Sequence, residues 1–156
     1  MIDEGLAAFI EGPVMIILAV ATPLDRPTIG RAVGARFDAG RQSITILVSR
    51  RQWPVLAGSI VPETQIAVTF CRASDYTTYQ VKGRVSAVRE PGAGEHALAA
   101  HYVQTTSQTL GALGVGQGMI DQWVPTDDII RLDFTPASVF VQTPGPSAGQ
   151  ALGGRP

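Results

Sequence analysis

The chain has 156 residues, of which 45% are hydrophobic and 16% charged, and its formal net charge is −1. This size suits one domain with a core of its own, and the composition excludes a disordered chain. The near-zero charge gives no general attraction to nucleic acid or anionic membranes, so we expect neither as a partner. The low charged fraction predicts much buried surface, including a subunit interface.

A single cysteine, Cys71, excludes an internal disulfide and fits a reducing cytoplasm. It lies in an apolar strand pattern, which favours a small core residue over a nucleophile. The N-terminus lacks the basic segment of a secretory signal. The apolar run from Val14 to Ala21 is far shorter than the roughly 20 residues that span a bilayer. We therefore expect a cytoplasmic protein.

In the first half of the chain, an apolar stripe predicts a helix over residues 3–11, which Gly12-Pro13 ends. Residues 14–22 read as a strand buried on both faces, and residues 28–37 as one strand. A turn at Asp38-Ala39-Gly40 leads to a strand over 43–49. Ser49 is expected to N-cap a short helix through Ile60, with Pro54 in its first turn.

The second half begins with strands over 65–71 and 77–89, and the latter should turn Val81 and Val85 to the core. A helix over 95–110 and a short helix over 116–123 follow. The inward residues expected on these two helices are Leu98, Tyr102, Leu110, Met119, Ile120 and Trp123. Strands over 129–134 and 138–142 complete a mainly β, α+β domain with an antiparallel barrel. The domain covers residues 1–143, and we expect the Gly/Pro-rich tail, 144–156, to dock on the protein or on a partner subunit.

Basic residues gather around one predicted hairpin. Arg31 and Arg36 lie on its first strand, and Arg50 and Arg51 follow its second. Because guanidinium groups bind phosphate in a planar, bidentate way, this grouping favours a phosphorylated ligand. Positions i and i+5 of a strand face opposite ways, so a bulge at Gly34 would be needed to realign the first pair. The alternative is that all these arginines are solvated surface charges.

Small residues share one face of the predicted strand over 28–37. Gly30, Ala32 and Gly34 alternate there and end at Arg36. Such a flat face would let a planar ring system approach the backbone, with the arginine at its charged end. The alternative is that the small residues permit close packing of another segment of the chain.

These residues carry a resemblance to a known family. Arg31-Ala32-Val33-Gly34-Ala35-Arg36 is similar to the R-x-V-x-x-[KR] strand of pyridoxamine 5′-phosphate oxidase-like FMN-binding split-barrel proteins. Val81-Lys82-Gly83-Arg84-Val85 is similar to their V-x-G-x-[AV] strand. The likeness spans roughly residues 5–142 and depends on the serial order of the motifs. It implies an antiparallel split β-barrel with flanking helices, which forms a homodimer with FMN in two sites at the subunit interface.

The resemblance also implies roles for particular residues. Arg31 and Arg36, with Arg50 or Arg51, would hold the phosphate. The backbone of Ala32, Val33 and Gly34 and of Val48 and Ser49 would line the flavin. In the family a few loop residues usually separate the strand from the basic pair, and this chain has none. Which of Arg50 and Arg51 contacts the phosphate is therefore left open.

Three functions are compatible with this pattern. The first is an FMN-dependent oxidoreductase acting on an unknown small-molecule substrate or redox partner. The second is a non-catalytic binding protein for flavin or haem. The third is a cofactor-free dimeric module, and the presence of Arg31 and Arg36 argues against it. His96 and His101 are spaced i, i+5 on a predicted helix, so they cannot form a helical metal pair, and we expect both on the surface and no metal site.

The C-terminal segment bears on the substrate. The family's namesake enzymes carry a basic R-L-x-x-R-type segment near their end, whereas residues 135–145 of this chain contain no basic residue. A buried substrate phosphate needs paired cations. Lys82, Arg84 and Arg131 are the nearest candidates in the sequence, and we expect a less charged substrate than pyridoxamine 5′-phosphate.

Overall fold

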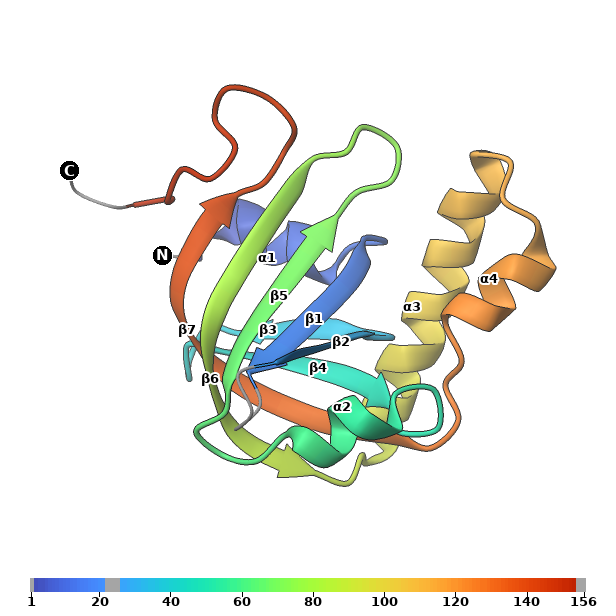
Figure 1. Ribbon diagram of the computed structural model, residues 1–156. Helices are drawn as coiled ribbons and strands as arrows, with labels where there is room; N and C mark the ends of the chain where they lie inside the picture. The colour runs from blue at the N-terminus through green and yellow to red at the C-terminus, as the bar shows by residue number, and fades with distance from the viewer. Residues whose placement is uncertain (1, 22–25, 154–156) are drawn as a thin grey trace.

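The structure is a computed structural model, and it describes residues 2–21 and 26–153. This part of the chain contains seven strands and four helices (Figure 1). In chain order they are α1 (Glu4–Glu11), β1 (Met15–Ala21), β2 (Pro27–Arg31), β3 (Ala35–Asp38), β4 (Ser43–Ser49), α2 (Pro54–Ser59), β5 (Gln65–Cys71), β6 (Thr78–Arg89), α3 (Ala93–Ala112), α4 (Gln117–Trp123) and β7 (Ile129–Val141).

One segment of the chain closes the sheet into a barrel. The strand order is β2-β1-β5-β6-β7-β4-β3 with antiparallel neighbours, so β2 and β3 are the two outermost strands. The prediction of one strand over 28–37 is wrong, because the segment between β2 and β3 leaves β1 and joins β4. The Ala32 N–H donates to the Ile16 carbonyl (3.0 Å) and the Val33 N–H to the Leu47 carbonyl (2.7 Å). The mainly β, antiparallel, split-barrel-like fold agrees with the sequence prediction.

Burial in the barrel follows the two-residue strand period. β1 buries Ile16, Leu18 and Val20 but leaves Ile17 38% exposed, so the expectation of a strand buried on both faces is wrong. The strands over 43–49 and 65–71 are confirmed, and Val81 and Val85 on β6 are fully buried as predicted.

β7 is one continuous strand, although the sequence suggested two strands joined at Thr135-Pro136-Ala137. Its partner β6 shifts register between Lys82 and Gly83, which lets the pairing pass Pro136. A Cβ atom at Gly83 would lie 2.1 Å from the Thr135 carbonyl oxygen. Only glycine permits this approach of the two backbones, which accounts for the glycine in the V-x-G-x-V strand.

The helices lie at the barrel's ends and sides. α1 begins at Asp3, whose carboxylate accepts the Leu6 N–H (2.8 Å). α3 buries a stripe with helical spacing: Glu95, Ala99, Tyr102, Thr106 and Leu110. α3 and α4 stand side by side beside the barrel (Figure 1). On α4, Ile120 is fully buried whereas Met119 is 52% exposed, so Met119 is not the anchor expected from the sequence.

Ser49 does not cap α2, contrary to the prediction. The helix starts only at Pro54, with Trp53 at its N-cap. The Ser49 hydroxyl donates to the Asp127 carbonyl (2.9 Å) and accepts the Gln52 N–H (3.2 Å). The serine therefore stabilises the turn over 50–52, and Pro54 takes the first helical position, where its missing N–H costs nothing.

The described part of the tail pairs with its own chain. The Val141 N–H donates to the Gln150 carbonyl (2.9 Å), and the Leu152 N–H donates to the Val139 carbonyl (2.8 Å). These residues run along the half of β7 that β4 does not reach. None of the described helices is long and apolar enough to cross a membrane.

Candidate functional site

Arg31 and Arg36 both meet α3. Arg36 Nη2 lies 3.6 Å from Glu95 Oε1 in the first turn of the helix. Two turns further along, Arg31 lies close enough to lower the pKa of Tyr102, although burial of the hydroxyl is the larger effect and raises that pKa to about 12. Between the arginines, Gly34 turns the chain with φ +150°, a conformation that other residues rarely adopt. The kink at Gly34 thus brings both arginines to the helix side of the barrel.

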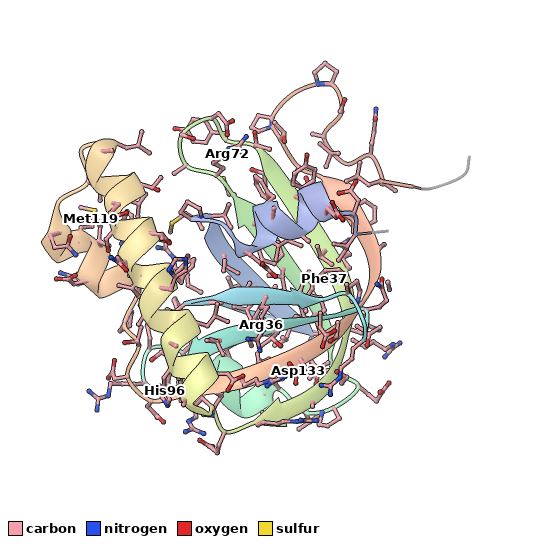
Figure 2. All side chains as sticks on the ribbon, turned by 180° about the vertical axis from the view of Figure 1, so that it is seen from behind. Arg36, Phe37, Arg72, His96, Met119 and Asp133 are labelled. Atoms are coloured by element: carbon pink, nitrogen blue, oxygen red, sulfur yellow. The ribbon has the colours of Figure 1, made fainter. Side chains whose placement is uncertain are left out.

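Arg36 belongs to an ion-pair cluster that the sequence did not reveal. Glu95 also lies 2.9 Å from Arg131 Nη1, and Arg131 Nε lies 3.0 Å from Asp133. Asp133 in turn accepts the Thr45 hydroxyl (2.6 Å). Figure 2 shows Arg36 and Asp133 near the end at which α3 begins. With two cations and two carboxylates, the cluster has no net charge.

The helix cap and the ion pairs fix the charge states in this cluster. Glu95 Oε2 accepts the Gly92 N–H (2.9 Å), which lowers the pKa of the Glu95 carboxyl, and Arg131 and Arg36 lower it further. A hydrogen bond to Asp133 raises the pKa of Arg131. An acidic residue three positions after a helix N-cap is a recognisable sequence signal, and it could have identified Glu95 as a capping residue.

Arg50 and Arg51 have acidic partners of their own. Arg50 Nη1 lies 2.6 Å from Glu90 and its Nη2 lies 2.7 Å from Asp128, and these hydrogen bonds raise its pKa. Arg51 Nη1 lies 2.9 Å from Asp127 and its side chain is 78% exposed. The four arginines therefore do not form one phosphate site as expected. Arg36, Arg50 and Arg51 are each paired with a different carboxylate or carboxylates of the same chain.

Arg31 is different, because no carboxylate of residues 2–21 or 26–153 forms an ion pair with it. Its Nη1 atom is buried and has no hydrogen-bond partner, and its Cζ lies 5.0 Å from the centre of the Trp123 ring. Three other buried polar atoms also lack a partner among the described residues, namely Gln52 Oε1, Trp53 Nε1 and Ser107 Oγ, whereas the Thr106 hydroxyl hydrogen-bonds Tyr102 and lowers its pKa. Leaving a buried donor or acceptor unpaired costs about 1–3 kcal/mol, more for a charged group, so such atoms indicate a missing partner.

One contact joins Arg31 to a helix outside the sheet. Trp123 of α4 lies over its guanidinium, and Gln52 donates to the carbonyl of the preceding Gln122 (2.8 Å). Trp53 lies on the other face of β2, because an added Cβ at Gly30 would lie 3.0 Å from its indole and neighbouring strand residues face opposite ways. We call Arg31 and Trp123 together the Arg31 site.

Side chains of two helices fill the flat face predicted for a planar ring. An added Cβ at Gly30 would lie 2.8 Å from Leu56 of α2, and one at Gly34 would lie 3.4 Å from Leu98 of α3. Ala32, Val33, Val48 and Ser49 are each at most 1% exposed. In this conformation the small residues serve the close packing of α2 and α3, which is the alternative interpretation of the pattern.

The remaining candidates lie apart from the Arg31 site. His96 and His101 are exposed on α3, and Cys71 is half-buried at the end of β5. Over residues 2–21 and 26–153, no three His, Cys, Asp or Glu side chains gather as a metal site would require. A groove of about 490 Å³ lies on the outer face of β1, β5 and β6, with Ala19, Ala67, Lys82 and Arg84 in its lining.

No protein-family model matches the sequence, and no curated protein matches it. Solved structures do match the fold, which is that of the pyridoxamine 5′-phosphate oxidase-like split-barrel proteins. An F420 reductase superposes with a TM-score of 0.56 at 16% identity, over 88% of this chain and 97% of that one. A putative pyridoxamine 5′-phosphate oxidase from Lactobacillus delbrueckii gives 0.52 at 11% identity, over 89% and 93%. HupZ of Group A Streptococcus gives 0.52 at 15% identity, over 96% and 100%.

Proposed function

We propose that the protein is an FMN-dependent oxidoreductase that binds the phosphate end of its cofactor at Arg31. The observation that carries this proposal is the buried, unpartnered Nη1 atom of Arg31. A phosphate monoester carries about −1.5 to −2 charges at neutral pH, and a guanidinium group is its preferred partner.

Arg31 fits an anionic group, whereas the strand face of Gly30 and Gly34, expected to line the flavin ring, has no room for a flavin in this conformation. Gly30 and Gly34 are covered by Trp53, Leu56 and Leu98. Lining of the ring by Ala32, Val33, Gly34, Val48 and Ser49 would therefore require these covering side chains to move. Arg36, Arg50 and Arg51 could add phosphate contacts only by exchanging their carboxylate partners for the ligand.

Bound FMN would supply reversible hydride or electron transfer at its ring, while the protein supplies binding and orientation. Arg31 would fix the charged end of the cofactor. Burial beneath α3 and α4 would exclude water from that contact and so strengthen it. A redox function is compatible with this fold, since one solved structure that shares it bears the name F420 reductase.

We also propose that the protein forms a homodimer in which the second copy covers the exposed outer face of β1 and β2. Ile17 is 38% and Ile29 57% exposed on the paired strands β1 and β2. Contiguous exposed apolar residues on a sheet are typical of an interaction surface. A second copy of the chain placed there would bury both side chains together with the groove beside Ala19 and Ala67.

Titration of cofactor-free protein with FMN, FAD and riboflavin, followed by flavin fluorescence, tests the cofactor. We expect FMN to bind most tightly, since it ends in the phosphate monoester that Arg31 would hold. Arg31→Ala should weaken FMN binding by about 1.5–3 kcal/mol, the range for hydrogen bonds to charged groups. Arg41→Ala is the matched control, because Arg41 lies in the same hairpin with its side chain 74% exposed. Arg36→Ala should cost less than Arg31→Ala, since Glu95 already neutralises Arg36.

Equal affinities for the three flavins, or no loss in Arg31→Ala, would contradict the phosphate contact. The spectrum and reactivity of the purified protein then separate the alternatives. Bound flavin that is not reduced by NADH or NADPH and does not pass electrons to an acceptor would favour a non-catalytic flavin protein. A Soret band on haem addition would favour a haem-binding protein. Absence of both ligands would favour a cofactor-free module.

A further inference from the structure

The element that covers Arg31 is held to the barrel at few points. Trp123, at the end of α4, stacks on the Arg31 guanidinium. Ile120 is fully buried, and the Gln122 carbonyl accepts the Gln52 side chain. The helix has seven residues, and the hydrogen bond that Gln117 makes to Asp121 (2.7 Å) lies within the helix itself. Met119 is 52% exposed and lies at the outer edge of the helical layer (Figure 2).

The connection from α3 to α4 contains two glycines, and hydrogen bonds from the Gly114 and Val115 N–H groups to the Gly111 and Leu110 carbonyls close the end of α3. Gly114 follows α3 with φ +88°, and Gly116 is the N-cap of α4. Within the helix, Gly118 has a lower helix propensity than alanine, although an added Cβ would meet no atom within 4 Å. Packing does not demand a glycine at position 118, so this residue weakens α4 without a compensating contact.

The stacking of Trp123 on Arg31 leaves the Nη1 atom of the guanidinium without a hydrogen-bond acceptor. The indole ring offers its face to the guanidinium, an attraction of about 0.5–2 kcal/mol. It offers no acceptor to Nη1, which stays buried and unpaired. A ligand phosphate would give Nη1 two or more charged acceptors, which is a stronger interaction than the ring can provide. An anionic ligand would therefore compete with Trp123 for the guanidinium.

We infer that α4 is a lid over Arg31, and that Trp123 occupies the guanidinium until an anionic ligand displaces it. Opening moves α4 about the Gly114–Gly116 connection, breaks the hydrogen bond between Gln52 and Gln122, and exposes the Arg31 guanidinium. This inference rests on the proposed function for the identity of the ligand, a phosphate-bearing flavin. The lid itself is a property of the ligand-free protein and can be measured without any flavin.

Chemical modification of Arg31 measures the opening. Phenylglyoxal reacts with accessible guanidinium groups, and the mass of the peptide that contains Arg31 reports the extent of reaction. We expect Arg31 to react slowly in the wild-type protein and at least several-fold faster in Trp123→Ala. Gln52→Ala, which removes only the tether to Gln122 and leaves the aromatic packing intact, should also raise the rate. Met119 lies on the same helix but away from the contact between Trp123 and Arg31. Arg31 should therefore react as slowly in Met119→Ala as in the wild-type protein.

Flavin affinity separates the lid from the proposed function. Removing an internal competitor of the stated strength should make Trp123→Ala bind FMN about 2- to 30-fold more tightly. The gain should vanish when Arg31 is also replaced by alanine. If no variant binds a flavin but Arg31 is unmasked in Trp123→Ala and Gln52→Ala, the lid stands and the proposed cofactor is wrong. Unchanged modification of Arg31 in both variants would overturn the lid, whatever the flavin affinity.

Discussion

Glu95 Oε1 lies 2.9 Å from Arg131 Nη1, so the first turn of α3 is ion-paired to the middle of the barrel. The other oxygen of the same carboxylate accepts the Gly92 N–H and caps the helix. Arg36 adds a longer contact of 3.6 Å. One side chain therefore fixes where α3 starts on the sheet. Because Tyr102 and Thr106 follow on the same buried stripe, Glu95 also sets the position of the helix at the Arg31 site.

Glu95→Gln should destabilise the protein by about 1–3 kcal/mol at pH 7, because the amide leaves Arg131 and Arg36 without their shared carboxylate. The effect should depend on pH. The pKa of Glu95 is lowered from its ordinary value of 4.5 in the folded protein, so its stabilising contribution is present above that value and is lost as the pH falls through the lowered folded-state pKa. Urea unfolding of both proteins between pH 3 and 7 measures this difference.

The two stability curves should lie apart at neutral pH and converge in acid. Glu4→Gln serves as the control, since Glu4 is exposed in the first turn of α1 and has no such cluster around it. A constant difference between Glu95→Gln and the unmodified protein across the whole pH range would show that the carboxylate's charge is not what stabilises α3.

Gly83→Ala should destabilise the barrel by at least about 1–3 kcal/mol, because the new methyl group would lie 2.1 Å from the Thr135 carbonyl oxygen and the strand backbones would have to separate. Gly58→Ala is the matched control: it lies in α2, and an added Cβ would meet no atom within 4 Å. That substitution should raise stability by about 0.5–1 kcal/mol through helix propensity. Thermal unfolding of the two variants checks the opposite signs, and a neutral Gly83→Ala would contradict the close approach of β6 and β7.

Ile29→Asp should convert the proposed homodimer into a monomer. Ile29 is 57% exposed on β2, so the new carboxylate is solvated in a single chain but would be buried without a partner between two copies. Sedimentation velocity at micromolar concentration gives the mass of each form. Val55→Asp is the control, because Val55 is 70% exposed on α2, away from this strand face. A dimer that survives Ile29→Asp would place the interface elsewhere, and a monomeric unmodified protein would refute the homodimer.

The FMN-loaded protein should not oxidise pyridoxamine 5′-phosphate at an enzymatic rate. Each basic residue considered for the substrate phosphate is already engaged: Lys82 stacks on Phe140 at 4.8 Å, Arg84 donates to the Glu63 carbonyl (3.2 Å), and Arg131 pairs with Glu95 and Asp133. Incubation with the substrate and oxygen, with pyridoxal 5′-phosphate measured over time, is a direct assay. Turnover of about 1 per second or faster would restore the namesake activity.

Local patterns in the sequence determined most of the strands and the fold class. The apolar alternation of residues 43–49 and 65–71 specifies strands because one face of each must be buried, and both appear with the predicted bounds. The alternation rule gave the wrong result for residues 28–37, where the chain stops pairing with β1 and begins to pair with β4. Nothing in residues 28–37 announces that Ala32 and Val33 donate to two different strands, since barrel closure depends on where β1 and β4 lie in space.

The arginines show the same division at the candidate site. Their presence on one hairpin was evident from the sequence, and so was the suggestion that Gly34 distorts the strand between Arg31 and Arg36. Which of them is free to bind an anion was not, because Glu90, Glu95, Asp127 and Asp128 lie 40 to 78 positions further along the chain than the arginines they pair with. Charge compensation is a through-space property. Only the tertiary structure could therefore show that Arg31 has no carboxylate partner among the described residues, and that its buried Nη1 lies under the Trp123 ring of a helix far along the chain.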